Sequence, residues 1–486
     1  MNRARWLLLA ACAWLLWIAP IKSGLTLDET STAWVVDGSL GETVHRASLY
    51  QGQSPLYYVL VRLVVLVFGG SEAVLRAPSV VATALATLVV ARIGRRIFDP
   101  DVGFYAAAAF VSTADVVYAA SDARPYALGV FLAAAATLAL VEWVETRRTW
   151  LGLLYAALAA SIVYVHYLFA STLLVHALYL VARVRTGRPV PSARSLALAG
   201  ALVGVALAPL VPQAGALEGR HRAIEYSPLA TWESFVGWLL PQAAIVPIVA
   251  GLACALGRQR LAPPAASADS TALVLGWHLV PRVSIFVFSR YVFRVFLSRY
   301  VLNAAPGFAL LLGWGIAALP TRRIANAVAC LMLLASCASF ASKRHSREDW
   351  KLTARCVREA LGRDRAPVVM NVGFVESMQP DWLEGDAERR SFLLAPLSRY
   401  DVGGEPVPFP LLVAPETRAY VERVASRLER CERFIFVTPW AEHADPPPWS
   451  WLQARLAPFG FVTRTAADTG WYRVFELERS SARAPR

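Results

Sequence analysis

The chain has 486 residues, of which 56% are hydrophobic and only 17% are charged, and its mean hydropathy is +0.45. This apolar share excludes an ordinary soluble domain, so we predict a polytopic membrane protein that buries surface in lipid. The net charge of +13 does not indicate nucleic-acid binding, because membrane proteins collect Arg and Lys in their cytoplasmic loops.

The amino terminus combines a basic start with an apolar run, as a secretory signal does. Trp6, Trp14 and Trp17 suit a helix at the membrane interface better than the apolar core of a cleavable signal. We therefore predict a retained signal anchor.

Apolar runs continue along most of the chain, and a helix needs roughly 20 mostly apolar residues to cross the hydrocarbon core. The sequence therefore predicts an all-α membrane domain with about eleven spans. The run at 54–70 is ambiguous, because it could be a twelfth span or an amphipathic helix on the membrane surface. The expected spans lie near 6–22, 74–94, 101–119, 125–144, 150–169, 170–184, 195–213, 235–256, 271–289, 300–319 and 323–341.

The distribution of arginine decides between these alternatives. If 54–70 lies on the surface, the short Arg-rich connections all fall on one side, as the positive-inside rule requires of cytoplasmic loops. We therefore predict an inner-membrane protein with an odd number of spans, a cytoplasmic amino terminus and an external carboxyl terminus. The connections contain Arg3, Arg5, Arg92, Arg95, Arg96, Arg147, Arg148, Arg183, Arg185, Arg188, Arg194, Arg258, Arg260, Arg322 and Arg323.

The composition becomes mixed polar and apolar after about residue 343. We predict a transmembrane domain over 1–342, whose first external loop is 22–73, and a small α/β domain outside the membrane over 343–486. Within the second domain, short strands are expected at 366–373, 433–439 and 471–478, and an amphipathic helix at 416–432.

Two acidic loops and a cationic cluster fall on the predicted outer face. The acidic loops contain Asp28, Glu29 and Asp122, and the cluster contains Arg290, Arg294 and Arg299 among aromatic residues. Arginine on the disfavoured side of the membrane needs an explanation, and guanidinium groups match phosphate oxygens bidentately. The cluster therefore indicates a phosphate held at the bilayer surface.

These features together suggest a transferase whose donor is a lipid phosphate. A carboxylate such as Asp28 could take the proton of an incoming hydroxyl, while arginines or a divalent ion stabilise the departing phosphate. An acidic pair after an apolar run is also typical of a helix amino terminus, where carboxylates are favoured as caps. The spacing of Asp28 and Glu29 leaves both interpretations open.

The same residues resemble the bacterial GT-C glycosyltransferases, in the branch similar to protein O-mannosyltransferases and the lipid A aminoarabinose transferase. The resemblance runs from residue 6 to about 360 and rests on the order of its motifs. These are LDETSTAW, QSPLYYVLVRLVVLVFGGSEAVLRAPS, GRRIFD, ASDARPYAL, VYVHYLFA, SRYVLNAAPGFALLL and REDWKLTARCVREA.

The resemblance implies transfer of a sugar from a polyprenyl-phosphate donor, with inversion, to an envelope glycan, lipid or protein on the outer face. Asp28 matches the family's catalytic aspartate, the general base, and Glu29 completes its motif. Asp122 matches the second acidic position, which positions the acceptor or a metal. Arg299 and Tyr300 match an Arg-Tyr pair that contacts the donor phosphate, with Arg290 or Arg294 assisting.

The resemblance also implies further substrate-binding residues. Arg124 and Tyr126 stand in the motif of Asp122, and Tyr57 stands in the LYY stretch. His166 matches a Thr-His-Tyr stretch of the family, although a lone histidine on an apolar helix is also typical of a hydrogen-bonded core residue.

One stretch departs from the family pattern. Relatives carry His-Pro-Pro or Lys-Pro-Pro before LYY, in some cases after an acidic metal ligand, whereas residues 51–55 here are QGQSP. The departure weakens the case for a bound metal, so a divalent ion is left open and no other cofactor is expected.

Two other classes of function remain as alternatives. A transporter or flippase for lipid-linked sugars could use the same arginines as a headgroup site, and a non-catalytic scaffold could bind an envelope polymer. A transporter is expected to carry ionisable groups near mid-bilayer and often to show repeated halves. The acidic residues instead gather at one face and no repeat is evident, which favours the enzyme.

Overall fold

The computed structural model describes residues 3–51, 54–213, 229–439 and 447–480. The chain divides into two compact units, which are described separately. Among the described residues, unit 1 contains 3–22, 38–51, 54–213 and 229–343, and unit 2 contains 23–37, 344–439 and 447–480.

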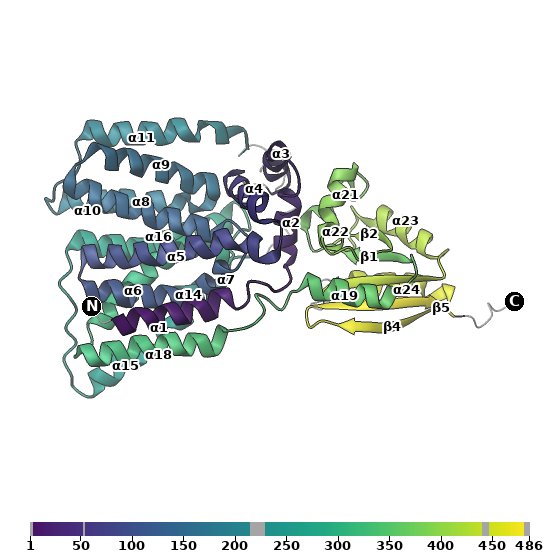
Figure 1. Cartoon of the computed structure of the whole chain (residues 1–486). Helices are drawn as coiled ribbons and strands as arrows, with labels where there is room; N and C mark the ends of the chain where they lie inside the picture. Colours follow the sequence, from purple (N-terminus) through teal and green to yellow (C-terminus); the bar gives the residue numbers. More distant parts are fainter. Residues whose placement is uncertain (1–2, 52–53, 214–228, 440–446, 481–486) are drawn as a thin grey trace. The chain divides into compact units, whose positions relative to one another are not determined.

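Unit 1 is a bundle of helices (Figure 1). In the described residues, seven helices are long and apolar enough to cross a membrane, and two bent pairs raise the number to as many as nine. The seven are α5 (Glu72–Ile97), α8 (Tyr126–Thr146), η2 (Tyr167–Ala170) with α10 (Ser171–Arg185), α11 (Ala193–Leu207) with its extension to Gln213, α16 (Ala268–Tyr291), η5 (Ser298–Ala304) with α17 (Ala305–Ala317), and α18 (Arg322–Phe340). The bent pairs are α6 (Pro100–Ser112) with α7 (Ala114–Ala120), and α14 (Trp232–Leu239) with η4 (Gln242–Ala244) and α15 (Ile245–Leu256).

The shorter helices of unit 1 complete the bundle. They are α1 (Arg3–Ala13) with η1 (Trp14–Ile18), α3 (Leu40–Tyr50), α4 (Leu56–Phe68) and α9 (Thr149–Val165). Each expected span coincides with a helix, so the all-α, multi-pass membrane architecture is confirmed, whereas the count of eleven stays a prediction. The ambiguous run forms α4, whose 13 residues are fewer than a span requires.

Small residues let the central helices approach closely. A Cβ atom at Gly103 of α6 would lie 2.4 Å from the carbonyl oxygen of Ala91 in α5. A Cβ atom at Gly313 of α17 would lie 2.5 Å from the backbone nitrogen of Ala106 in α6. Helices that pack in lipid use small residues at such crossings, because close packing replaces the hydrophobic effect there.

The Arg-rich connections gather at the end of the bundle where α1 begins (Figure 1). Ion pairs join them across the helix ends: Arg5 lies 3.1 Å from Asp101, Arg322 lies 2.7 Å from the same carboxylate, and Arg96 pairs with Glu145. We call this the basic end of unit 1.

Unit 2 contains a five-stranded sheet in the order β2-β1-β3-β5-β4. β1 lies parallel to both β2 and β3, whereas β5 is antiparallel to its neighbours β3 and β4. The strands are β1 (Pro367–Asn371), β2 (Glu405–Phe409), β3 (Arg433–Pro439), β4 (Phe461–Asp468) and β5 (Tyr472–Arg479). A small α/β domain near the carboxyl terminus is therefore confirmed.

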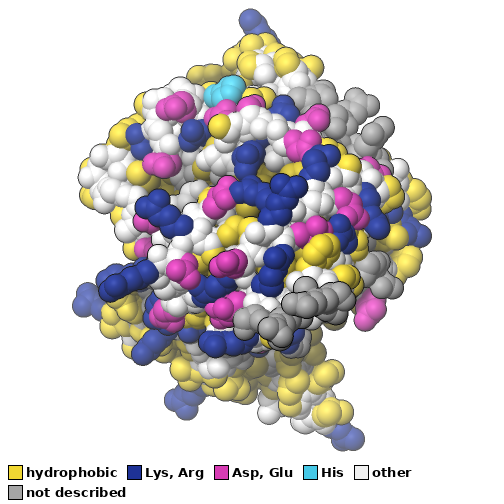
Figure 2. Space-filling model, turned by 90° about the vertical axis from the view of Figure 1, so that its right-hand side faces the viewer, with side chains coloured by type: hydrophobic (Ala, Val, Ile, Leu, Met, Phe, Trp, Pro, Cys, Tyr) yellow, Lys and Arg dark blue, Asp and Glu magenta, His cyan; other side chains and the backbone are white. Residues whose placement is uncertain are grey.

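Short helices flank this sheet (Figure 1). They are α19 (Trp350–Leu361), η6 (Val375–Met378), α20 (Pro380–Leu383), α21 (Ala387–Leu393), α22 (Ala395–Arg399), α23 (Arg418–Leu428), α24 (Pro448–Leu456) and η7 (Ala457–Phe459). Figure 2 shows a face on which Lys and Arg side chains lie among Asp and Glu side chains. Such mixed charge is typical of a surface in contact with water.

One helix of unit 2 comes from the other end of the chain. α2 (Leu27–Val35) packs on α22, and the indole nitrogen of Trp34 donates to Ser391 at 2.9 Å. The backbone of Leu25 holds the approach to this helix, because it donates to the Tyr400 hydroxyl at 2.9 Å and accepts from Trp350 at 3.0 Å. The acidic stretch after the first span is thereby fixed to the sheet domain.

Candidate functional site

The amino terminus of α2 shows what each member of the acidic pair does. Thr26 is the N-cap, its hydroxyl accepts from the Glu29 backbone at 3.3 Å, and the Glu29 carboxylate accepts from the Thr26 backbone at 2.9 Å. Such reciprocal bonds form a capping box. The side chain of Glu29 is fully buried, whereas that of Asp28 is half-buried. The capping interpretation therefore holds for Glu29.

Asp28 lies in an acidic part of unit 2. The neighbouring Glu348 carboxylate accepts from the Leu27 backbone at 2.8 Å and from the Tyr472 hydroxyl at 2.7 Å. Burial, together with the charges of Asp28 and Glu29, raises the pKa of Glu348 to about 7, although both hydrogen bonds oppose the shift. Burial also raises the pKa of Tyr472 well above its usual range, and Glu348 adds to this. Glu348 therefore changes charge near neutral pH.

A histidine lies close to Glu29 in the same unit. A carboxylate oxygen of Glu29 and a ring nitrogen of His345 lie within 4.8 Å of one another. Imidazole and carboxylate are both ligands of divalent metals. Glu29 and His345 are therefore candidate ligands for the divalent ion that the sequence left open.

In unit 1, Asp122 and Arg124 are held on the loop that precedes α8. Both side chains are buried, at 3% and 7% exposure. The Arg124 guanidinium donates to the side-chain oxygen of Gln51 at 2.8 Å, and the Tyr58 hydroxyl donates to the same oxygen at 3.1 Å. Gln51, which stands in the stretch that departs from the family pattern, therefore positions Arg124. Gly52 and Gln53 of that stretch lie outside the described residues.

Tyr57 is fully buried behind this loop. Its hydroxyl lies 3.5 Å from that of Ser79, which in turn donates to the backbone oxygen of Arg124 at 3.4 Å. Tyr57 therefore contacts the loop of Asp122 and Arg124 through Ser79.

Three aromatic rings of unit 1 form a compact cluster. The ring centroid of His166 lies 5.4 Å from that of Tyr126 and 5.3 Å from that of Tyr300, and the two tyrosine rings are 6.2 Å apart. The guanidinium of Arg299 lies 5.4 Å from the Tyr300 ring, and the charges of Arg124 and Arg299 both act on His166. The fold thus gathers five predicted residues, which we call the ring cluster.

His166 differs from the hydrogen-bonded core histidine that was one expectation. Its side chain is 5% exposed, and neither ring nitrogen has a hydrogen-bond partner within the part of the chain that the structure describes. A buried polar atom without a partner costs free energy, so such atoms are typical of ligand sites.

The other two arginines of the predicted phosphate site differ from Arg299 in burial. Arg290 is in the last turn of α16 and Arg294 follows it, and both side chains are exposed, whereas Arg299 is half-buried. The sequence also missed partners that the fold supplies, namely Gln51, Glu348, Tyr472 and His345. Glu348 belongs to the REDW sequence of one family motif, so the motif could have identified it as a candidate site residue.

The sequence comparison links part of the chain to one family. Residues 52–212 match the family model described as dolichyl-phosphate-mannose-protein mannosyltransferase. A search of curated proteins gave no match.

Solved structures show a likeness over nearly the whole chain. ArnT from Cupriavidus metallidurans in the apo state is 12% identical, with a TM-score of 0.59 over 98% of both chains. The same protein bound to undecaprenyl phosphate gives 12% identity and a TM-score of 0.57 over 99% of both chains. The chain has the GT-C fold. The resemblance to GT-C glycosyltransferases expected from the sequence is therefore confirmed.

An archaeal GT-C protein extends the comparison. AglB, the oligosaccharyltransferase from Archaeoglobus fulgidus, was solved in complex with an inhibitory peptide and a dolichol-phosphate. It is 12% identical, with a TM-score of 0.51 over 99% of this chain and 75% of that one. These GT-C matches include unit 2, for which the sequence beyond about residue 360 carried no family signal.

Proposed function

We propose that this GT-C protein transfers a sugar from a polyprenyl-phosphate donor to a hydroxyl group of an envelope glycan, lipid or protein. Transfer takes place on the outer face of a bacterial inner membrane and inverts the anomeric carbon. The amino terminus lies in the cytoplasm and the sheet domain lies outside.

The assignment of the base is supported by the capping box. Its hydrogen bonds commit the Glu29 carboxylate to the backbone of Thr26, whereas Asp28 occupies a half-buried position in the first turn of α2. Asp28 is therefore the member of the pair that is suited to accept a proton. This observation carries the proposal.

The donor site is supported by the ring cluster and by the comparisons. A half-buried guanidinium on an aromatic platform suits a phosphate at the membrane surface, since Arg299 supplies paired donors. The ArnT structure bound to undecaprenyl phosphate and the AglB complex with a dolichol-phosphate are consistent with a polyprenyl-phosphate ligand. Asp122, Arg124, Tyr126, Tyr57 and His166 then surround or support the substrates.

The reaction requires one proton transfer and one displacement. Asp28 takes the proton of the acceptor hydroxyl as its oxygen attacks the anomeric carbon from the face opposite the phosphate. The bond between that carbon and the phosphate oxygen breaks, and polyprenyl phosphate leaves with its charge stabilised by Arg299. Glu29 and His345 are donors that suit a divalent ion, but two groups do not complete a site, so no step is assigned to a metal.

The first test is release of polyprenyl phosphate from radiolabelled polyprenyl-phosphate sugars by the purified full chain in membrane extract. Asp28→Asn should lower the turnover at least a hundredfold, because the variant cannot accept the proton. Asp37→Asn is the matched control, since Asp37 is an exposed carboxylate of the same segment. Equal turnover by wild type and Asp28→Asn would remove the base from the proposal.

The donor site is tested by Arg299→Ala in the same assay. Loss of the guanidinium should raise the KM for the donor and lower kcat, because the phosphate is bound before and after transfer. Lys343→Ala, which removes an exposed cation after α18, should leave both constants within twofold. An unchanged KM for Arg299→Ala would place the phosphate elsewhere.

One observation favours a second candidate, a flippase for lipid-linked sugars. Arg282 and His278 are buried in the middle of α16, and the guanidinium of Arg282 lies 2.9 Å from a ring nitrogen of His278. Ionisable groups at such depth are typical of transport paths. Movement of a fluorescent polyprenyl-phosphate sugar across liposomes, without release of polyprenyl phosphate, would support this candidate against the transferase.

A further inference from the structure

A cleft of about 370 Å³ lies at the basic end of unit 1. Its walls come from the end of α8, the start of α9, the start of α11 and the connection before α11. α8 is 21 residues long, so the cleft lies roughly 30 Å along this helix from Tyr126 and the ring cluster. The cleft is therefore separate from the proposed donor site.

The lining of the cleft changes from polar to apolar along the helices. Arg147, Thr149, Ser192 and Ser195 line it where α9 and α11 begin. Further along these helices the lining residues are Leu153, Leu198 and Leu202, with 50%, 54% and 40% of their side chains exposed. A polar mouth followed by exposed leucines matches an amphiphile that lies along the membrane-facing surface.

The polar part of the cleft is positively charged. The side chain of Arg147 is exposed and forms no hydrogen bond or ion pair within the described ranges. The amino termini of α9 and α11 open at the same place, and helix amino termini favour anions. Among the residues that the structure describes, no acidic side chain lines the cleft. The site therefore suits an anion.

A largely buried indole side chain also lines this space. Trp143 lines the cleft and is 3% exposed, yet its indole N–H donates to no group in the described part of the chain. A Cβ atom at Gly152, which also lines the cleft, would lie only 2.8 Å from the Trp143 ring, so the glycine makes room for the indole. The indole N–H is therefore available to donate to an acceptor in the cleft.

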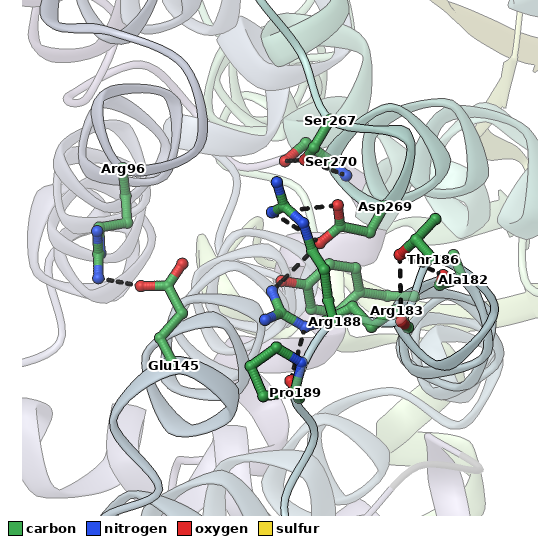
Figure 3. Close-up of polar contacts among 11 residues, drawn as sticks. Arg96, Glu145, Ala182, Arg183, Thr186, Arg188, Pro189, Ser267, Asp269 and Ser270 are labelled. Carbon is green, nitrogen blue, oxygen red and sulfur yellow. Dashed lines mark hydrogen bonds and ion pairs between the residues drawn. The ribbon is translucent and has the colours of Figure 1, made fainter.

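The connection that forms one wall is held in place by ion pairs to the buried carboxylate of Asp269 (Figure 3). The carboxylate of Asp269 lies 3.2 Å from Arg183 and 3.3 Å from Arg188, and Arg183 also donates to the backbone oxygen of Pro189 at 3.2 Å. Val190, the next residue along, lines the cleft. The wall is therefore fixed before any ligand binds, which lowers the entropic cost of binding.

We propose that this cleft binds an anionic glycerophospholipid of the leaflet at the basic end. The phosphate lies between Arg147 and the amino termini of α9 and α11, and it accepts from the Trp143 indole. The acyl chains follow Leu153, Leu198 and Leu202 along the surface of the bundle. This site is independent of sugar transfer.

Two substitutions remove the anion site without weakening the helices. Arg147 adopts a left-handed backbone, with φ of 57°, so Arg147→Gly removes the charge at a position whose conformation favours glycine. Ser192 is the N-cap of α11 and Ser195 is its N3 residue, so Ser195→Glu completes a capping box while adding a negative charge to the cleft. Arg323→Ala removes an exposed cation elsewhere at the basic end and is the control.

The test is native mass spectrometry of the purified full chain in detergent, titrated with dioleoylphosphatidylglycerol. Arg147→Gly and Ser195→Glu should each weaken binding at least tenfold without lowering Tm in lipid-free detergent, and Arg323→Ala should stay within twofold of wild type. Dioleoylphosphatidylcholine should bind at least fivefold more weakly to wild type.

Four results would overturn the proposal. Retained binding by both cleft variants would show that the lipid lies elsewhere, and an equal loss in Arg323→Ala would show a general charge effect. Equal binding of phosphatidylcholine would show that the cleft does not recognise the negative charge of the lipid. If inorganic phosphate bound as tightly as the lipid, with the same dependence on Arg147, the cleft would be a site for a free anion.

Discussion

Glu348 places a titratable carboxyl beside Asp28 and Glu29, and its raised pKa makes the stability of unit 2 depend on pH. Its pKa is about 7 in the folded chain and about 4.3 in an unfolded one, so the folded state binds more protons between these values. Stability should therefore be full below about pH 4 and fall as the pH rises through 7. Glu348→Gln cannot titrate and should lose this dependence.

The readout is hydrogen exchange of peptides from β5, corrected for the intrinsic rate at each pH. Between pH 5.5 and 8, the opening free energy of wild type should fall by on the order of 1 to 2 kcal/mol more than that of Glu348→Gln. Glu478→Gln, an exposed position of the same strand, should keep the wild-type dependence. The same slope in wild type and Glu348→Gln would contradict the assignment.

At the residue scale, the sequence could predict groups that share a motif but not those that meet across the chain. Asp122, Arg124 and Tyr126 stand within one short stretch, so their proximity was visible. Gln51 contacts Arg124 across 73 positions, and Glu348 contacts Leu27 across 321. Such pairs depend on tertiary structure, which local patterns do not determine.

Among the elements, the strands with buried apolar patterns were predicted and the edge strands were missed. The expected strands at 366–373, 433–439 and 471–478 correspond to β1, β3 and β5, and the expected helix corresponds to α23. β2 has the sequence EPVPF and lies at an edge, the position where proline is tolerated because one side needs no donors. β4 is the other edge and is mostly exposed, so its pattern carries little apolar signal.

The crossing of α17 and α6 gives a prediction for one pair of elements. A side chain at Gly313 would collide with the backbone of Ala106, so Gly313→Val must push the helices apart. We expect Tm in detergent to fall by roughly 5 to 10 °C.

Gly315 of the same helix supplies the control. A Cβ atom there would meet nothing within 4 Å, so Gly315→Val should shift Tm by less than about 2 °C. Equal shifts in the two variants would mean that helix propensity, rather than the crossing, determines the effect.

For the whole molecule, the arginine distribution predicts the orientation in the membrane. Reporter fusions after Leu319, after Lys343 and at residue 486 bracket α18 and the sheet domain. Green fluorescent protein fused after Leu319 should fluoresce, because this position is predicted to be cytoplasmic. Alkaline phosphatase fused at the other two positions should be active, because that enzyme needs an oxidising compartment. Fluorescence of a green fluorescent protein fused at residue 486 would contradict the predicted topology.

Unit 2 combines residues 23–37 with described residues after Lys343, and this has a consequence for biosynthesis. α2 emerges from the ribosome early, but the groups that receive it, such as Ser391 and Phe392, are made after every helix of unit 1. Helix α2, which carries the acidic pair, can therefore dock only after most of the chain has been translated. A fragment that begins at residue 344 lacks α2 and leaves the Phe392 face uncovered, so we expect it to aggregate. The protein can acquire its complete acidic site only once the last strand has been synthesised.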